Sequence, residues 1–401
     1  MKPARLPAGS WVAVLGGGQL GRLFCMAAQS LGYRVCVLDP AADCPAGAVA
    51  DRHLKADYDD PSALADIART CAAATTEFEN VPAQALRFLA GQIRVAPAAD
   101  SVAIAQDRIA EKSFLREAGL PIGDYAVIAC RQDLRDAPDH LFPGILKAAR
   151  FGYDGKGQAS VADRDEALAA LEHHFGYPSD AGQSGPDGVP CILERRLDLA
   201  CEVSVMVARG LDGALLTWPV TRNVHCNGVL ATSTVPAMVG DLIERKAIDA
   251  AIRVAQSLNY SGVLGVEFFV LNDSSVLVNE IAPRPHNSGH WTLDAAVTSQ
   301  FEQQARILAG LPLGATNLLV PAAMLNLLGD CWHEPSPEQG VVAVDPDWAA
   351  VLSESTAKLY LYGKRSARPG RKMGHVTVLG IDGVDAPLTL IRIAQRLGAN
   401  H

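Results

Sequence analysis

The chain has 401 residues, of which 49% are hydrophobic and 20% charged, and its formal net charge is −9 at pH 7. This length predicts two or three domains with sizeable cores. The acidic balance argues against a general nucleic-acid-binding or membrane-binding surface, whereas a local basic pocket could still take a small anionic substrate. No apolar run approaches the roughly 18 residues of a membrane span.

Nine cysteines are dispersed along the chain without a Cys-x-x-Cys pair. This distribution predicts reduced thiols in a cytoplasmic protein, not a disulfide framework or a zinc site. Residues 1–10 hold no signal-peptide apolar core, because Trp11–Leu15 leads directly into a glycine turn.

The chain opens with the pattern of a doubly wound parallel sheet. A buried strand, a glycine turn, an amphipathic helix and a second strand are predicted at Trp11–Leu15, Gly16–Arg22, Leu23–Leu31 and Arg34–Leu38. This order of elements is the first unit of such a sheet.

The glycine turn admits two interpretations. Gly16, Gly18 and Gly21 fit a dinucleotide-binding fingerprint, and Asp39 stands near the place of the ribose-binding acid. An NAD-dependent dehydrogenase is therefore one hypothesis. The fingerprint is weak alone, because a helix N-terminus behind a glycine turn binds any phosphate.

The alternation of strands and helices continues to about residue 118. A helix at 61–70, a strand at 73–76, a strand at 93–95 and a helix at 104–118 are predicted. Glu77 and Glu79 follow the 73–76 strand, where strand ends face a ligand crevice, and could bind sugar hydroxyls. The alternative is a pair of helix N-terminal acids favoured by the helix dipole.

From Pro121 the pattern changes to strands with longer connections. Strands are predicted at 125–128, 145–148, 158–161 and 191–194, a helix at 165–174 and a mobile loop at 177–189. Between the second and third of these strands lies Gly152–Gln158, with three glycines and Lys156, and Lys147 precedes it. Backbone amides in such a loop form an anion-binding concavity, and the lysines supply charge for phosphates. A surface turn is the alternative.

The last part of the chain carries three glutamates in predicted strands. Glu202 lies in an alternating strand, and Glu267 and Glu280 interrupt two apolar strands that predict an antiparallel hairpin. Buried carboxylates need a partner, and oxygen ligands together with nucleotide phosphates suit magnesium. A salt-bridged structural pair is the alternative. The polar loop Ile281–His290 follows, and a basic turn at Arg368–His375 is either a phosphate site or a solvated loop.

Together these segments resemble the ATP-grasp ligases, and among them the 5-(carboxyamino)imidazole ribonucleotide synthetases of purine biosynthesis. The matching motifs are GGGQLGR at 16–22, TTEFENVP at 75–82, GYDGKGQ at 152–158, NEIAPRPHNSGHWT at 279–292, YGK at 362–364 and RPGRKMGH at 368–375. The resemblance implies an α/β (α+β overall) ATP-grasp fold. Its expected parts are an N-terminal doubly wound parallel-sheet domain at 1–110, a small central lid domain at 111–196 and a C-terminal mixed α/β domain at 197–401 with a basic subregion.

The resemblance also implies a site for ATP and magnesium. The residues that it places around ATP are Arg108, Lys147, Gly152, Tyr153, Asp154, Gly155, Lys156, Gly157, Gln158, Glu194, Arg195, Arg196, Leu197, Glu202, His225, Asn279 and Glu280. Arg108, Lys147 and the glycine loop would hold the phosphates, and residues 194–197 would form the adenine-side hinge. Glu267 and Glu280 would bridge Mg²⁺ to the phosphates.

A second implied site takes 5-aminoimidazole ribonucleotide and bicarbonate. Its expected residues are Gln19, Glu77, Glu79, Tyr153, Asp154, Arg284, His286, Asn287, Lys364 and Arg371. Within both sites the expected catalytic residues are Arg284, Lys156, Asp154, His286 and Asn287. The expected reaction is carboxylation of the ribonucleotide's amine through carboxyphosphate, by a homodimer. Rival hypotheses are a formate-dependent glycinamide ribonucleotide transformylase, the dehydrogenase, and an inactive binding protein of the same fold.

Overall fold

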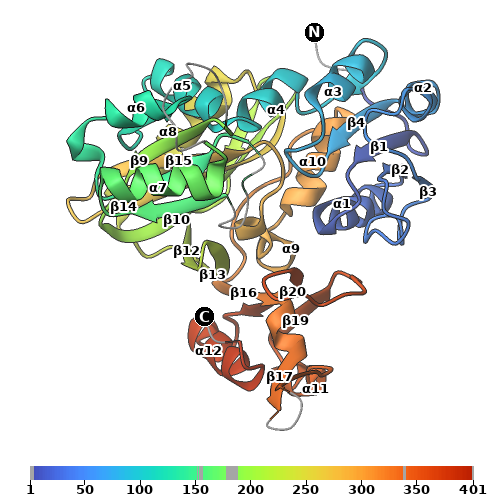
Figure 1. Ribbon diagram of the computed structural model, residues 1–401. Helices are drawn as coiled ribbons and strands as arrows, with labels where there is room; N and C mark the ends of the chain where they lie inside the picture. Colours follow the sequence, from blue (N-terminus) through green and yellow to red (C-terminus); the bar gives the residue numbers. More distant parts are fainter. Residues whose placement is uncertain (1–3, 151, 153–156, 178–187, 337–339, 400–401) are drawn as a thin grey trace.

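In a computed structural model of the protein, residues 4–150, 152, 157–177, 188–336 and 340–399 are described. Their strands form three principal sheets and one two-stranded ribbon (Figure 1). Within these residues, no helix is long and apolar enough to cross a membrane. All nine cysteines are free, as predicted, and six of them are buried.

The first sheet is parallel and doubly wound, as the sequence predicts. Its strands run in the order β3-β2-β1-β4-β5. They are β1 (Trp11–Leu15), β2 (Arg34–Leu38), β3 (Arg52–Leu54), β4 (Ala73–Thr76) and β5 (Arg94–Val95). The strand order reverses beside β1, and ligand crevices of such sheets lie at the carboxyl ends of the strands on either side of the reversal.

Helices from two distant parts of the chain cover this sheet. One face carries α2 (Pro61–Thr70), α3 (Ala83–Ala90) and α4 (Ala99–Ala105). The other face carries α1 (Gln19–Ser30) and α10 (Gln300–Ala309), whose Phe301 and Leu308 are buried in the same cluster as Leu23 and Phe24 (Figure 1). The N-terminal core is therefore completed by a helix that lies far along the chain.

The second sheet has four antiparallel strands in the order β6-β9-β7-β8. They are β6 (Tyr125–Ile128), β7 (Gly144–Ala148), β8 (Gln158–Val161) and β9 (Cys191–Arg195). The helices α6 (Arg131–Arg135), η1 (Asp139–Leu141) and α7 (Arg164–Phe175) close its core. Most of the predicted 177–189 loop lies outside the described residues.

The third sheet has nine strands and is antiparallel. Along its path β15-β14-β10-β12-β13-β16-β20-β19, with β11 beside β10, the strand β15 forms one edge. The strands are β10 (Leu199–Arg209), β11 (Leu215–Thr217), β12 (Thr221–Cys226), β13 (Val229–Val235), β14 (Gly262–Leu271), β15 (Val276–Ala282), β16 (Ala322–Leu328), β19 (Ala357–Leu361) and β20 (Lys372–Leu379). Helices α5 (Arg108–Glu117) and α8 (Asp241–Ser257) pack against its first strands.

The polar loop after β15 contains η2 (Asn287–Gly289) and α9 (Thr292–Ala295). The C-terminal segments are η3 (Gly329–Trp332), β17 (His333–Ser336), β18 (Gly340–Ala343), α11 (Trp348–Leu352) and α12 (Ala386–Arg396). Helix α12 packs on β16 and β20, with Leu390 and Ile393 buried (Figure 1).

Three local predictions are wrong. The single helix predicted at 104–118 is two helices, α4 and α5, because Asp107 leaves the helical conformation and caps α5 by accepting hydrogen bonds from the backbone of Ile109 and Ala110. The turn predicted to reach Arg22 ends earlier, since α1 begins at Gln19. The basic turn predicted to reach His375 ends where β20 begins, at Lys372.

Candidate active site

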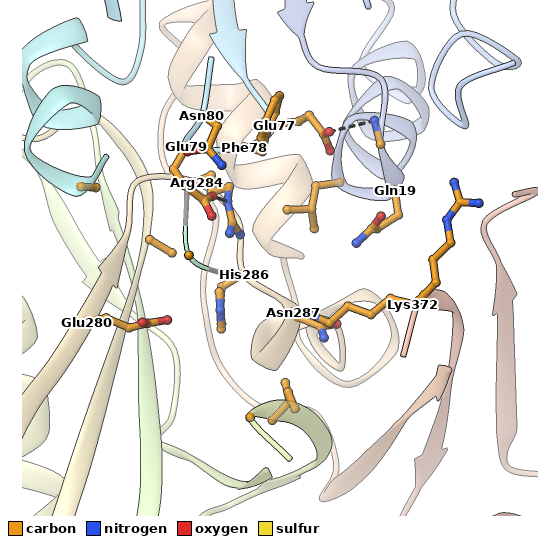
Figure 2. Close-up of a pocket in the computed structure, with 18 of the residues that line it drawn as sticks. Gln19, Glu77, Phe78, Glu79, Asn80, Glu280, Arg284, His286, Asn287 and Lys372 are labelled. Carbon is orange, nitrogen blue, oxygen red and sulfur yellow. Dashed lines mark hydrogen bonds and ion pairs between the residues drawn. The ribbon is translucent and has the colours of Figure 1, made fainter. Parts of the chain in front are cut away.

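A cavity of about 1110 Å³ lies where the three sheets meet. Seventeen of the expected site residues line it: Gln19, Glu77, Glu79, Arg108, Lys147, Gly152, Gln158, Glu202, His225, Glu267, Asn279, Glu280, Arg284, His286, Asn287, Lys364 and Arg371. Figure 2 shows part of this lining, with Glu280 on one side and Gln19 on the other. The structure thus gathers segments from both ends of the chain into one site.

The glycine turn of β1 and α1 binds a carboxylate of the protein itself. Glu77 accepts hydrogen bonds from the backbone N–H groups of Gly18 (2.8 Å) and Gly21 (3.0 Å) at the start of α1 (Figure 2). A helix N-terminus favours a negative charge. Burial nevertheless raises the pKa of Glu77 above its ordinary value.

Asp39, the candidate ribose-binding acid, is likewise hydrogen-bonded by groups of the protein itself. Its carboxylate accepts hydrogen bonds from the backbone of Gly17 (2.7 Å) and Ala41 (2.8 Å) and from the Tyr58 hydroxyl (2.6 Å). Both features on which the dehydrogenase hypothesis rests therefore have structural partners within the chain.

Glu79 and Arg284, which the sequence analysis treated as separate ligands, form an ion pair. Arg284 Nε donates to Glu79 Oε2 at 2.6 Å (Figure 2). Burial would raise the pKa of Glu79, but the Arg284 guanidinium holds it below its ordinary value. This pair joins the first sheet to the loop that follows β15.

The two strand glutamates lie opposite each other. Strands β14 and β15 are antiparallel, as predicted, and Glu267 pairs with Glu280 in their ladder. Two negative charges directly opposite each other repel. Burial and the neighbouring Glu280 raise the pKa of Glu267 to about 7. An oxygen-binding cation such as Mg²⁺ would relieve this repulsion, so the pair fits a metal site.

Among the described residues, no group of three or more His, Cys, Asp or Glu side chains is arranged to hold a metal ion. Figure 2 shows the Glu280 side chain extending from its strand into the cavity.

Charged side chains from β7, β9 and α5 form ion pairs close to Glu280, one of the two candidate metal ligands. Glu194 on β9 forms ion pairs with Lys147 on β7 and with Lys112 on α5, the latter at 3.0 Å. Burial would raise the pKa of Glu194, but the two lysines lower it to about 2. Burial lowers the pKa of Lys147. Arg108, also on α5, approaches Glu280 Oε2 at 3.4 Å.

Two histidines contact carboxylates of the site. His286 Nε2 lies 3.4 Å from Glu267 Oε1, and its Nδ1 accepts a hydrogen bond from the Ser288 backbone at 3.3 Å. Burial and then Arg284 hold the pKa of His286 well below its ordinary value. His225 Nδ1 lies 3.0 Å from Glu202 Oε2. Burial opposes the charge on His225, but this contact with Glu202 raises its pKa.

Two asparagines offer unsatisfied polar atoms to the cavity. Within the described chain, Asn279 Oδ1 and both amide atoms of Asn287 are buried without a hydrogen-bond partner. Buried amide groups are costly to leave unpaired. Because both side chains line the cavity, these atoms are suited to contact a ligand.

The basic side of the cavity comes from the connection between β19 and β20 and from the first residue of β20. Lys364 Nζ donates to the backbone oxygen of Lys372 at 2.7 Å, and an Arg371 guanidinium nitrogen donates to the Ser366 backbone at 2.9 Å. Lys364, Arg371 and Lys372 all line the cavity. Their positive charge makes this side suited to a phosphate group.

Five of the expected residues that the structure describes do not line the cavity. Gly157, Glu194, Arg195, Arg196 and Leu197 lie outside it, and Arg195 and Arg196 are exposed. Tyr153, Asp154, Gly155 and Lys156 are not among the described residues. The lining or supporting residues that the sequence analysis missed include Glu111, Lys112 and Lys372. The spacing of Glu111 and Lys112 from Arg108, three and four positions on a helix, could have indicated the first two.

Three family models match the chain in consecutive order. They are a ribonucleotide synthetase preATP-grasp domain at residues 10–106, an ATP-grasp domain at 113–301, and a phosphoribosylaminoimidazole carboxylase C-terminal domain at 322–386. The fold inferred from the resemblance is therefore confirmed.

Individual relatives agree over nearly the whole length. The chain is 44% identical to N5-carboxyaminoimidazole ribonucleotide synthase of Brucella melitensis, over 94% of this chain and 98% of that protein. It resembles an ADP complex of N5-carboxyaminoimidazole ribonucleotide synthetase with a TM-score of 0.86, 35% identity and coverage of 98% and 97%. It also resembles the Aspergillus clavatus enzyme in complex with ADP and 5-aminoimidazole ribonucleotide (TM-score 0.84, 29% identity, coverage 98% and 99%).

Proposed function

The chain belongs to the family of N5-carboxyaminoimidazole ribonucleotide synthases, which are ATP-grasp ligases, and from this premise we propose how its cavity performs the reaction. The reaction is the ATP-dependent carboxylation of 5-aminoimidazole ribonucleotide in purine biosynthesis. The observation that carries the proposal is the cavity itself, which has paired carboxylates at β14 and β15 and basic side chains at Lys364 and Arg371.

ATP occupies the side of the cavity between the second and third sheets. Lys147, Arg108 and the glycine loop at 152–158 bind its phosphates, because they supply positive charge and backbone amides. Glu202 is suited to the ribose hydroxyls. Residues 194–197 serve as the adenine-side hinge through their backbone. Glu267 and Glu280 would hold Mg²⁺, which would neutralise phosphate charge.

The ribonucleotide occupies the side formed by the first sheet and the C-terminal strands. Lys364 and Arg371 bind its 5′-phosphate, and Gln19 and Glu77 face its sugar from the start of α1 and the end of β4. The family resemblance assigns Tyr153 and Asp154 of the glycine loop to the same substrate. Burying a dianionic phosphate requires basic partners, and the connection between β19 and β20 provides them.

Arg284, His286 and Asn287 orient bicarbonate between the two substrates. Bicarbonate is a poor electrophile, and transfer of the γ-phosphate to it gives carboxyphosphate and ADP. The amine of the imidazole then attacks the carboxyl carbon, phosphate leaves, and the amine loses a proton. Lys156 and Arg284 compensate the charge during phosphoryl transfer, which depends mainly on positioning and electrostatics. Enclosure of the site protects carboxyphosphate from water.

The remaining features of the proposal concern the whole protein. We expect three domains at 1–110, 111–196 and 197–401 and a homodimer, on the basis of the family resemblance. Light scattering coupled to size exclusion would test the dimer. Nine free thiols favour a reducing compartment such as the cytoplasm.

The direct test is ADP release from MgATP and bicarbonate, measured with and without 5-aminoimidazole ribonucleotide. The proposal predicts that the ribonucleotide and bicarbonate together stimulate release, and that the product carries one carboxyl group on its amine. If only glycinamide ribonucleotide with formate stimulates ADP release, the protein is instead the formate-dependent glycinamide ribonucleotide transformylase. The absence of stimulation by either substrate pair would contradict both assignments.

A further inference from the structure

Helix α5 holds both peptide groups that flank Glu280. Glu111 Oε1 accepts a hydrogen bond from the backbone N–H of Ile281 at 2.6 Å, and Lys112 Nζ donates to the backbone oxygen of Asn279 at 2.9 Å. Both helix residues are only 3% exposed. One peptide group precedes Glu280 and the other follows it, so the backbone of this residue is restrained on both sides.

These contacts occur where the sheet cannot supply them. Strand β15 is an edge of the nine-stranded sheet, and the only backbone segment bridged to its outer side among the described residues is Pro121–Ile122, at Val278. The outer backbone groups of Asn279 and Ile281 therefore have no neighbouring strand. Its ladder with β14 also shifts register, since Glu267 pairs with Glu280 but Phe268 pairs with Val278. Asn279 is the extra residue of this bulge. Bulges redirect side chains, and they are common beside active sites.

The same helix connects this bulge to the phosphate-binding side of the cavity. Lys112 also contacts Glu194 Oε1 at 3.0 Å, and Glu194 in turn pairs with Lys147. Arg108, one helical turn before Lys112, approaches the Glu280 carboxylate itself at 3.4 Å. Three residues on one face of α5 thus act on Glu280 through its side chain and through both of its peptide groups.

We propose that Glu111 and Lys112 are positioning residues that set the direction in which the Glu280 carboxylate enters the cavity and so prepare it for a divalent cation. Neither side chain needs to touch the cation. A small cation demands closely defined ligand geometry, and side chains that orient a metal ligand commonly change metal affinity by about 10- to 100-fold. The proposal rests on the assignment of Glu280 to the metal site in the proposed function.

Two conservative substitutions separate positioning from simple electrostatics. Glu111→Gln removes the charge but keeps an oxygen that can accept the Ile281 hydrogen bond. Glu111→Asp keeps the charge but withdraws the oxygen by one methylene group. Positioning predicts that Glu111→Asp weakens binding of Mn²⁺ in the presence of ADP by about 10- to 100-fold, measured by electron paramagnetic resonance. Glu111→Gln is expected to bind Mn²⁺ nearly as well as the wild type.

Glu117→Asp is the matched control, because Glu117 is an exposed residue on the last turn of the same helix. It should leave Mn²⁺ affinity unchanged. Wild-type affinity in the Glu111→Asp variant, or a greater loss in Glu111→Gln than in Glu111→Asp, would overturn the proposal. If neither variant folds, Lys112→Met removes the other contact. Weaker Mn²⁺ binding in Lys112→Met supports the proposal, and unchanged binding overturns it.

The Michaelis constants provide a second criterion. Glu111→Asp should raise the half-saturating Mg²⁺ concentration while leaving the Michaelis constant for the ribonucleotide unchanged. A general loss of structure would instead raise both together and would contradict the proposal. The Mn²⁺-binding measurement requires no turnover, so its result does not depend on whether the ribonucleotide stimulates ADP release. Wild-type protein that binds Mn²⁺ with ADP but fails to release ADP with the ribonucleotide would refute the proposed function alone.

Discussion

Glu267 and Glu280 face each other across the β14–β15 ladder, with the Glu267 side chain almost fully buried. On an antiparallel pair, opposite residues have Cβ atoms about 4.5–5.5 Å apart and project from the same face of the sheet. Two carboxylates at this spacing destabilise the protein unless a cation or a proton lies between them. Burial, and after it this repulsion from Glu280, raises the pKa of Glu267.

Glu280→Gln should lower Mg²⁺-dependent ADP release by at least about 100-fold, because phosphoryl transfer would lose one cation ligand. The melting temperature should change little, since the substitution also removes one of two repelling charges. Steady-state ADP release and a thermal melt measure both quantities. Asp273→Asn is the matched control, because Asp273 is an exposed carboxylate in the turn of the same hairpin. Near-normal turnover of Glu280→Gln would remove this residue from the metal site.

Lys364→Ala should raise the Michaelis constant for the ribonucleotide by roughly 10- to 100-fold, the value of one charge-assisted hydrogen bond to a phosphate. The Michaelis constant for ATP should change much less, because Lys364 lies on the C-terminal strands' side of the cavity. Lys358→Ala, at an exposed position on β19, is the control. Equal effects on both substrates would contradict the placement of the 5′-phosphate.

Gly18→Ala should displace Glu77 from the start of α1. The backbone of Gly18 suits any residue, with φ of −74°, but an added Cβ would lie 2.8 Å from Glu77 Oε2 and closer still to Oε1. Loss of the hydrogen bonds to Gly18 and Gly21 should lower the free energy of unfolding by about 1–3 kcal/mol, measured by urea denaturation.

Gly91→Ala provides a comparison with similar φ (−71°), where the added Cβ would make an ordinary 3.5 Å contact with the Phe88 carbonyl. Its stability should equal or exceed that of the wild type, because alanine restricts the unfolded chain. Equal stabilities of the Gly18→Ala and Gly91→Ala variants would show that Glu77 does not depend on this glycine.

His375 should make the protein sensitive to mild acid. Its ring is fully buried, stacks on Tyr360 and accepts or donates a hydrogen bond with the Tyr362 hydroxyl at 2.8 Å, while the His290 ring lies 4.7 Å away. Burial lowers the pKa of His375 to about 3. Between this value and the ordinary value of about 6.5, the unfolded chain binds a proton that the native protein does not. Its contribution to stability is therefore present above pH 6.5 and declines as the pH falls.

At pH 5 the decline due to His375 amounts to about 2 kcal/mol relative to pH 7.5. Between pH 7.5 and pH 5, the free energy of unfolding should fall by about 2 kcal/mol less in His375→Phe than in the wild type. Urea denaturation at both pH values measures this difference. His174→Gln, at an exposed position on α7, should behave like the wild type. Parallel losses in His375→Phe and the wild type would show that the ring is protonated without cost.

Local patterns in the sequence were sufficient for most strands of the first two sheets. Helix α2 has its predicted bounds because Asp60 caps it and Pro61 occupies its first turn. The hairpin of β14 and β15 follows from two apolar runs around a polar turn. The predicted helix at 104–118 failed because its periodicity continues across Asp107, where a capping side chain interrupts the helix.

The sequence by itself determined which segments we expect to carry the chemistry: the glycine loop, the two glutamates Glu267 and Glu280, the Arg284–Asn287 loop and the C-terminal basic residues. These signals are local, since residue type and spacing along the chain define them. Only the tertiary structure decided how each group is engaged. Glu77 binds the start of α1, Glu79 pairs with Arg284, and α5 restrains Glu280. A buried polar group takes its properties from the partners that folding brings to it, and those partners lie far away along the chain.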